Sequence, residues 1–339
     1  MNKLASFFLL TAGASLLLLS SCQIDPDPPD RYALVYGVSD YEDSVQIKIE
    51  EKIFHFPNLN WTDEDAKSVA DLFHQKGYKT LLRLNDGNTD YEKFDIKEAS
   101  VEQFKKDINF LSQNSDENSI IIIYFSGHGT SGFPSIEDKE PYNSNKQNEW
   151  LVTYHNADET ITKDAYDSFN DYFISDDFMA EKIRELPTTK NVLIIDACLS
   201  GGFIGSSYDV DTAPSDYSTK DEQIDGIFGE AFRSYFSSDS ADVTWQEGVV
   251  MTASGESENS MEPLSDDTTI QHGFFTYSLL ESVSNDLDND GFISTMELYS
   301  YTRRFFEVNF NDNAYWPLDH QYLPRISGGA VDFVLFEAD

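Results

Sequence analysis

Short apolar segments recur along the chain and alternate with amphipathic segments. Six apolar runs have the length of β-strands, and they lie at residues 32–38, 80–84, 120–125, 151–154, 192–197 and 249–253. The runs IIIIYF and VLII show no alternation of polar and apolar residues, which is typical of central strands that are covered on both faces. The pattern predicts a mostly parallel sheet built from βαβ units.

Three segments between these runs have the period of amphipathic helices. Thr62 is predicted as the N-cap residue of the first, while Ser175 caps the third and Pro187 ends it. The apolar stripes of the first two are Ala66, Val69, Ala70 and Phe73, and Val101, Phe104, Ile108 and Leu111. Strands that alternate with such helices predict an α/β fold, with a mostly parallel central sheet flanked by helices on both faces.

Two stretches interrupt this alternation. Residues 130–149, and above all residues 204–246 with their many Asp and Ser residues, are predicted as loops or insertions on the same side of the sheet. A chain of 339 residues is long enough for two domains, or for one large α/β domain with a tail and insertions. The second arrangement is expected, with one domain over residues 32–330 and a tail or edge strand over residues 331–339.

The first 21 residues have the pattern of a secretory signal, with Lys3 near the start and an apolar run from Phe7 to Leu19. The segment LSSC at its end resembles the lipobox of bacterial lipoproteins, in which the cysteine, here Cys22, is diacylated and becomes the N-terminus. Residues 22–31 are rich in Pro and Asp and are predicted as a stiff tether. The expected protein is an exported, membrane-anchored lipoprotein on the periplasmic or cell-surface side. An ordinary signal peptide is the alternative.

The formal net charge of −38, from 61 acidic and 23 basic residues, argues against binding to nucleic acid or to anionic lipid. An acidic surface attracts cationic partners, although it also serves simply to keep a protein soluble. The chain has two cysteines, and if Cys22 carries lipid, Cys198 has no partner within the chain for a disulfide. Cys198 is then either an inert residue or a reactive thiol.

Two of the predicted central strands end in unusual sequences. The run IIIIYF leads into SGHG, which places His128 between glycines, and VLIIDA leads into CLSGG, which places Cys198 after a strand. Ligands of open parallel sheets bind beyond the carboxyl ends of the strands, so both residues are expected at one rim. A thiol with an imidazole nearby forms a nucleophile and base pair that can attack a carbonyl. The alternative interpretation of Cys198 is a small core residue.

Together, YFSGHG and IIDACLSGG resemble the caspase-like cysteine peptidases, and specifically their metacaspase-like bacterial branch. The resemblance runs from about Tyr32 to Gly328 and includes YALVYGVSDY, DEDAKSVADLF, GYKTLLRL, GFFTYSLLESV and QYLPRISGG in order. It implies a caspase-type sheet, a catalytic dyad of Cys198 and His128, and a thioester intermediate. It also implies an oxyanion hole formed by the backbone N–H groups of Gly129 and Cys198.

The resemblance further implies a specificity, because the metacaspase-like branch cleaves after Arg or Lys and has an acidic substrate pocket. The matching positions here are Asp196, Asp65 and Ser126. Asp196 ends an apolar strand, where a buried carboxylate needs a partner, whereas Asp65 lies in the first turn of a helix and could serve as a capping charge. The expected substrates are peptides or proteins with Arg or Lys before the scissile bond.

One position departs from the pattern of some metacaspases, which have an aspartate seven residues after the cysteine. That position is Gly205 here, and Asp209 and Asp211 are candidates to replace the missing carboxylate. The same acidic insertion contains Lys220 and Arg233, so self-cleavage within it is expected of a peptidase with this specificity.

A second motif, DLDNDGFISTME, matches the calcium-binding loop of an EF-hand. Its loop positions hold Asp286, Asp288 and Asp290 at 1, 3 and 5, Gly291 at 6, Phe292 at 7, Ser294 at 9 and Glu297 at 12. Oxygen ligands at alternate positions can surround a Ca²⁺ ion, with the Phe292 carbonyl and a bidentate Glu297 completing the site. The expected role of Ca²⁺ is structural or activating. An acidic turn that binds no ion is the alternative.

These features predict an exported, lipid-anchored cysteine endopeptidase that needs no cofactor for its chemistry. One alternative is a catalytically silent, surface-anchored calcium-binding module that keeps the caspase-like fold, and another is acyl transfer to an amine by the same dyad. The remaining histidines show no metal-ligand spacing and are expected on the surface or in packing contacts: His55, His74, His155, His272 and His320.

Overall fold

The computed structural model describes thirteen segments of the chain. They are residues 28–41, 46–49, 52–87, 91–131, 149–155, 161–162, 172–197, 248–253, 260, 262–263, 270–311, 324–327 and 332–338. The predicted signal and most of the tether, the loop at 132–148 and the insertion at 204–246 lie outside these segments. Among the described residues, no helix has both the length and the apolar composition needed to cross a membrane.

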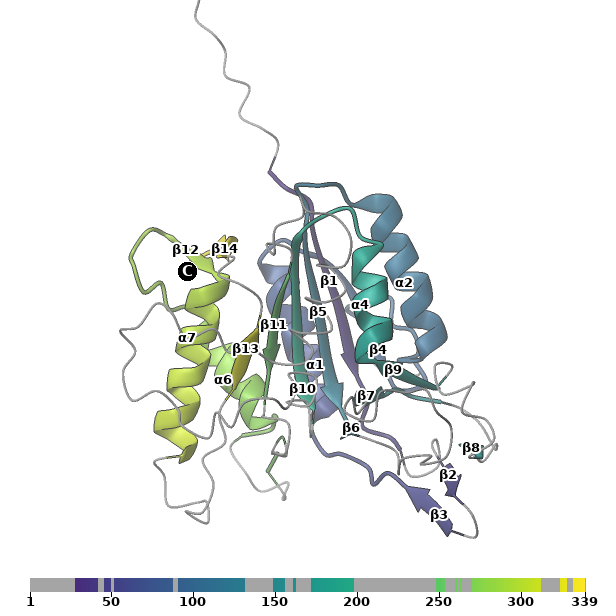
Figure 1. The fold of residues 1–339 in the computed structure, drawn as a ribbon. Helices are drawn as coiled ribbons and strands as arrows, with labels where there is room; N and C mark the ends of the chain where they lie inside the picture. The colour runs from purple at the N-terminus through teal and green to yellow at the C-terminus, as the bar shows by residue number, and fades with distance from the viewer. Residues whose placement is uncertain are drawn as a thin grey trace, which may run out of the picture.

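A six-stranded sheet in the order β13-β11-β10-β5-β1-β4 forms the centre of the molecule (Figure 1). Its strands are β1 Arg31–Gly37, β4 Lys79–Leu84, β5 Ile120–Gly127, β10 Lys190–Ala197, β11 Val249–Thr252 and β13 Arg325–Ser327. All neighbours in this sheet pair in parallel except β13, which runs antiparallel to β11. The predicted α/β fold with a mostly parallel central sheet is therefore confirmed.

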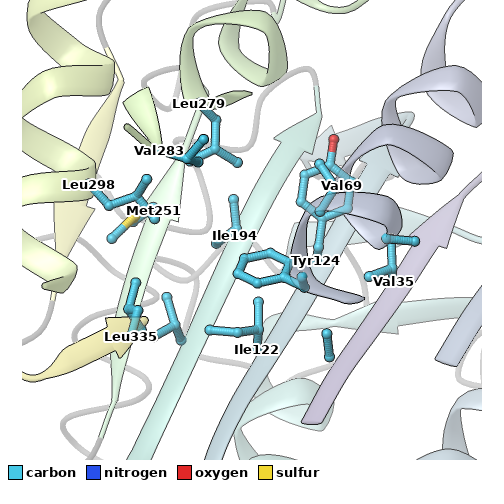
Figure 2. Packing of buried hydrophobic residues seen from close by; sticks show 14 of the residues in the cluster. Val35, Val69, Ile122, Tyr124, Ile194, Met251, Leu279, Val283, Leu298 and Leu335 are labelled. Atoms are coloured by element: carbon cyan, nitrogen blue, oxygen red, sulfur yellow. The ribbon is translucent and has the colours of Figure 1, made fainter. Parts of the chain in front are cut away.

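Helices cover both faces of this sheet (Figure 1). They are α1 Thr62–Gln75, α2 Val101–Asn114, α4 Asp176–Arg184, α6 Phe274–Ser282 and α7 Thr295–Phe306, which continues into the π-helical segment η3 Glu307–Asn311. Successive side chains of a strand point to opposite faces, so Ile121 and Ile123 pack with α2 and α4, whereas Ile122 and Tyr124 pack with α1 and α6. Figure 2 shows residues of the core on the face of the sheet that α1 and α6 cover.

The start of α1 differs from the predicted capping. The helix begins at Thr62, but the N-cap residue is Trp61, and the Thr62 hydroxyl donates to the carbonyl of Val38 at 2.7 Å. The backbone N–H groups of Asn60 and Trp61 instead donate to the carboxylate of Glu262, at 3.0 and 3.1 Å. These two N–H groups precede the first turn of the helix, and the Thr62 hydroxyl binds Val38 rather than a helix N–H, so the prediction of Thr62 as the N-cap was wrong. Ser175 does cap α4, as predicted.

One predicted strand belongs to a different sheet. The run at 151–154 forms most of β7 Glu149–Val152, which lies between β6 Gly129–Ser131 and β9 Phe173–Ser175 in a small antiparallel sheet. Its apolar side chains are buried there rather than in the central sheet, so burial alone could not assign the partner strands. Two further small sheets join β2 Gln46–Ile49 with β3 Lys52–His55 and β8 Ile161–Thr162, and β12 Phe292–Ser294 with β14 Val334–Glu337.

Candidate active site

The carboxyl ends of β5 and β10 lie side by side. In the register of the two strands, Asp196 is opposite Ser126 and Ala197 is opposite Gly127. The chain leaves β5 through His128 and leaves β10 toward Cys198, which itself lies outside the described residues. The two sequence motifs therefore start from neighbouring positions on one edge of the sheet, where open parallel sheets bind their ligands.

The ring of His128 is held in one orientation. Its Nε2 lies 2.8 Å from the carbonyl oxygen of Pro57. Because a carbonyl can only accept, the ring proton on this bond belongs to Nε2, which leaves Nδ1 as the atom able to accept a proton. The aromatic rings of Tyr41 and Phe56 pack against the imidazole with centroids 4.7 and 5.4 Å away. Burial lowers the pKa of His128, so the neutral base form is favoured.

Tyr41 also fixes the backbone of His128, a role that sequence reasoning missed. The Tyr41 hydroxyl accepts from the His128 N–H at 2.9 Å and donates to the carbonyl of Val152, also at 2.9 Å. A side chain on Gly127 would not fit, because its Cβ would lie 2.5 Å from the Tyr41 hydroxyl oxygen. The only available signal was the presence of Tyr41 in the motif YALVYGVSDY, without any indication of its contact.

Gly129 opens β6 and stands opposite Leu151 of β7. The backbone of His128 joins the same pairing, since its carbonyl accepts from the N–H of Val152 at 2.9 Å. The turn that carries His128 is thus anchored to a second sheet.

The following predicted site residues lie outside the described residues: Cys22, Cys198, Gly205, Asp209, Asp211, Lys220 and Arg233.

Three other predicted site residues, Asp65, Ser126 and Asp196, come together at this edge. The Ser126 hydroxyl donates to Oδ2 of Asp65 at 3.0 Å, and the backbone N–H of Gly273 donates to Oδ1 of Asp65 at 3.0 Å. Both carboxylates are buried, with 1% of Asp65 and 4% of Asp196 exposed. The donors to Asp65 come from β5 and from the start of α6, not from its own helix, so its position is not explained by helix capping.

The carboxylate of Asp196 is held by the first turn of α6. Its Oδ2 accepts from the Thr276 hydroxyl at 2.6 Å and from the Thr276 N–H at 3.2 Å, and its Oδ1 accepts from the hydroxyl of Ser260. A Cβ on Gly273 would lie 2.7 Å from Oδ2 of Asp196 and 3.1 Å from Oδ2 of Asp65. Glycine is therefore required between the two acids, which lie close to one another on either side of it.

His272 is a further member of this cluster, and its contact with Asp65 was missed by the sequence analysis, which expected a surface or packing residue. Its Nδ1 lies 3.0 Å from Oδ1 of Asp65. The pKa of Asp65 is raised to about 7, because the effects of burial and of the charge of Asp196 outweigh the hydrogen bonds from His272 and Ser126, which lower it. Burial also raises the pKa of Asp196. Among the described residues, no Lys or Arg contacts either carboxylate.

The acidic loop predicted to bind calcium joins α6 to α7. Ligand oxygens of Asp286, Asp288 and Asp290 lie within 4.8 Å of one another. Gly291 has φ +90°, a left-handed conformation that permits the turn after the third acid. The carboxylate of Glu297 returns to the loop and accepts from the backbone N–H of Leu287 at 2.9 Å and of Ser294 at 2.9 Å. This set of hard oxygen donors fits Ca²⁺.

Comparison with known proteins agrees with this architecture. A family model described as the caspase domain matches residues 30–324. Protein GSU0716 from Geobacter sulfurreducens has a similar solved structure, with 14% identity, a TM-score of 0.50, and coverage of 88% of this chain and 93% of that one. The structure of caspase-1 from Spodoptera frugiperda has 11% identity and a TM-score of 0.46, and the match covers 88% of each chain. No curated protein matches the sequence. Because the family model spans most of its length, the chain belongs to the caspase-domain family of cysteine peptidases, whose substrates are peptides or proteins.

Proposed function

We propose that the protein is a cysteine endopeptidase of the metacaspase-like branch that cleaves peptide bonds after Arg or Lys. The observation that supports this most strongly is the buried acid pair of Asp65 and Asp196. It lies at the carboxyl ends of β5 and β10, the strands that lead to His128 and Cys198. A basic side chain bound to this pair would place the following peptide bond near the ends of the same two strands.

In the proposed reaction, Nδ1 of His128 accepts the proton of the Cys198 thiol, and the thiolate attacks the carbonyl carbon of the scissile bond. The hydrogen bond from Nε2 to Pro57 supports this role because it orients the other ring nitrogen as the base. Backbone N–H groups of Gly129 and Cys198 stabilise the oxyanion. The imidazolium then protonates the leaving amine, a thioester forms, and water activated by His128 releases the acid product.

The lowered pKa of His128 has a consequence for this mechanism. Burial disfavours the imidazolium, so the free enzyme retains the neutral base below the usual pH for histidine. The thiol and imidazole are then expected to start as a neutral pair rather than as a thiolate and imidazolium pair. Proton transfer accompanies attack on the substrate in this case.

The test uses peptides that differ only in the residue before the scissile bond, namely Arg, Lys, Asp or citrulline. Wild type is expected to cleave the Arg and Lys peptides, and Cys198→Ala and His128→Ala to lose at least about a thousandfold in kcat/KM. His74→Ala is the control, because this exposed residue lies at the far end of α1 from Asp65. Equally slow release by wild type and Cys198→Ala from every peptide would instead favour the catalytically silent module.

The proposal includes anchoring and self-processing. Lipid on Cys22 would hold the protein at a membrane surface, and the enzyme would cleave its own insertion after Lys220 or Arg233. Intact mass spectrometry of wild type and Cys198→Ala tests both modifications. A diacylglycerol mass on both proteins and fragments from wild type alone are expected, whereas an unmodified, uncleaved mass in both would contradict this part.

The proposal also includes calcium at the loop of residues 286–297. Asp286, Asp288, Asp290, the Phe292 carbonyl and Glu297 would hold the ion, which would stabilise the connection between α6 and α7. Titration calorimetry with CaCl₂ is expected to detect one site in wild type and none in Asp286→Asn. Glu117→Gln, which removes an exposed acid elsewhere, is the matched control. Identical heats for wild type and Asp286→Asn would show that the loop binds no ion.

A further inference from the structure

His272 contacts the acid pair from the segment that precedes α6. Its Nδ1 lies 3.0 Å from Oδ1 of Asp65, and 20% of the His272 side chain is exposed against 1% of that of Asp65. The next residue, Gly273, donates its backbone N–H to the same carboxylate at 3.0 Å. Two consecutive residues therefore bind Asp65, one through a rigid backbone group and one through a side chain that reaches solvent.

All hydrogen bonds to Asp65 favour its ionised form. Oδ1 accepts from His272 and Gly273, and Oδ2 accepts from the Ser126 hydroxyl at 3.0 Å and from Gly273 at 3.3 Å. When Asp65 is ionised it can only accept, so Nδ1 of His272 carries the proton of this bond in that state. Of these donors, only His272 can also carry a positive charge.

The surroundings contain acids but no other base among the described residues. Besides His272, the groups that face the pair of Asp65 and Asp196 are Tyr124 and Ser126 from β5, Thr276 from α6, and Ser260 and Glu262 from the residues before α6. Burial raises the pKa of Glu262, and the charge of Asp196 adds to the increase. The neighbouring negative charges therefore disfavour the ionisation of Asp65, and the imidazole of His272 has the opposite effect.

We propose that His272 is a positioning residue of the substrate pocket: it favours the ionised form of Asp65 and orients this carboxylate for the basic side chain of the substrate. This inference rests on the proposed function and adds the residue on which its specificity depends. His272 acts through Asp65 and touches no reacting atom. Without it, a larger fraction of Asp65 would be protonated at neutral pH, and the pocket would carry less negative charge.

The titration of Asp65 predicts how the pH dependence of cation binding changes when His272 is removed. Burial raises the pKa of Asp65 to about 7, so the carboxyl is partly protonated at neutral pH even with His272 in place. Loss of the imidazole removes a hydrogen bond and a charge that lower this pKa. The pH at which a cation binds well is therefore expected to rise in a variant without His272.

The experiment compares full-length wild type, His272→Ala, His272→Gln and the control His74→Ala. Each is given two peptides that differ only in Arg or citrulline before the scissile bond, from about pH 6 to about pH 9. Citrulline has the shape of Arg without its charge, so the ratio of the two kcat/KM values reports the charge of the pocket. Thermal unfolding of each variant confirms that it is folded.

His272→Ala is expected to lose about fivefold of the Arg preference at pH 7 and to regain it near pH 9, because a rise of one unit from a pKa of about 7 lowers the ionised fraction at pH 7 from about one half to about one tenth. Cleavage of the citrulline peptide stays unchanged. His272→Gln, whose amide can donate to Asp65, keeps more of the preference, and His74→Ala behaves as wild type. An Arg preference and pH profile of His272→Ala that coincide with those of wild type would overturn the inference.

A second measurement separates this inference from the proposed function. Agmatine, which carries the guanidinium of arginine, is expected to raise the Tm of Cys198→Ala at pH 7 and to have a smaller effect on Cys198→Ala/His272→Ala. If wild type cleaves no peptide but agmatine shows this difference, the proposed activity fails while the role of His272 stands. If agmatine shifts both proteins equally, the role of His272 fails.

Discussion

Two buried clusters of charged and polar side chains lie on opposite faces of the central sheet. In the first, Arg83 of β4 binds Asp107 of α2 through two hydrogen bonds of 2.7 and 2.6 Å. Gln103 and Tyr36 also donate to this carboxylate, at 2.9 and 3.1 Å. In the second cluster, the donors that the described residues supply to the acid pair of Asp65 and Asp196 are neutral groups and one histidine.

The difference indicates what each cluster does. The first contains one positive and one negative charge with bidentate geometry, so it is complete within the folded chain. The second keeps two carboxylates in a site that raises their pKa values, without a Lys or Arg partner among the described residues. Such an arrangement reduces stability, and its retention favours a role in binding a cation.

The largest effect is expected from breaking the balanced pair. Arg83→Met leaves the Asp107 carboxylate buried without its partner, and about 3–5 kcal/mol of unfolding free energy is expected to be lost. Arg83→Met/Asp107→Leu removes both charges and should recover most of that loss. Urea denaturation measures both. Equal stabilities of the single and double variants would mean that the pair is not the reason for the loss.

Removal of one charge from the acid pair is expected to have a smaller effect on stability and a large effect on substrate specificity. Asp196→Asn removes the charge that a basic side chain would contact, so kcat/KM for an Arg peptide should fall roughly a hundredfold. The stability loss should be less than that of Arg83→Met, because burial already disfavours the charged form of Asp196. Steady-state rates with Arg and citrulline peptides test this. An equal loss for both peptides would contradict a role in charge recognition.

The pH dependence of stability should separate the clusters further. The pKa of Asp65 is about 7 in the folded protein and near 3.8 when unfolded, so the folded state keeps a proton that the unfolded state loses. Asp65 therefore lowers stability as pH rises from about 4 to about 7, by on the order of 1.4 kcal/mol per pKa unit. Asp65→Asn should remove this decline in urea unfolding experiments. Parallel curves of unfolding free energy against pH for wild type and Asp65→Asn would exclude a contribution of Asp65 to this decline.

The smallest effects come from a matched pair of hydroxyl deletions. Tyr36→Phe and Ser126→Ala each remove one hydroxyl donor to a carboxylate, at 3.1 and 3.0 Å, and each should lower the unfolding free energy by about 1 kcal/mol. Only Ser126→Ala should shift the pH dependence of Arg cleavage to higher pH, because its bond lowers the pKa of Asp65. A similar shift in Tyr36→Phe would mean that the two clusters are coupled.

Local sequence patterns predicted most of the central sheet and the helices beside it. Uninterrupted apolar runs identified β5 and β10, and their polar ends drew attention to His128 and Asp196. The patterns failed where a distant group replaced a local one. The N-cap of α1 is Trp61 rather than Thr62, whose hydroxyl binds the distant carbonyl of Val38, and the run at 151–154 pairs outside the central sheet.

The sequence by itself determined the five parallel strands of the central sheet and the polar residues that end two of them, because the spacing of apolar side chains within a strand or helix is a local property. Only the tertiary structure decided which polar groups meet. His272 binds Asp65 across 207 positions of the chain, and Tyr41 binds the backbone of His128 across 87. No local pattern records these contacts, because they arise when the sheet order and helix packing bring distant ends of elements to one edge.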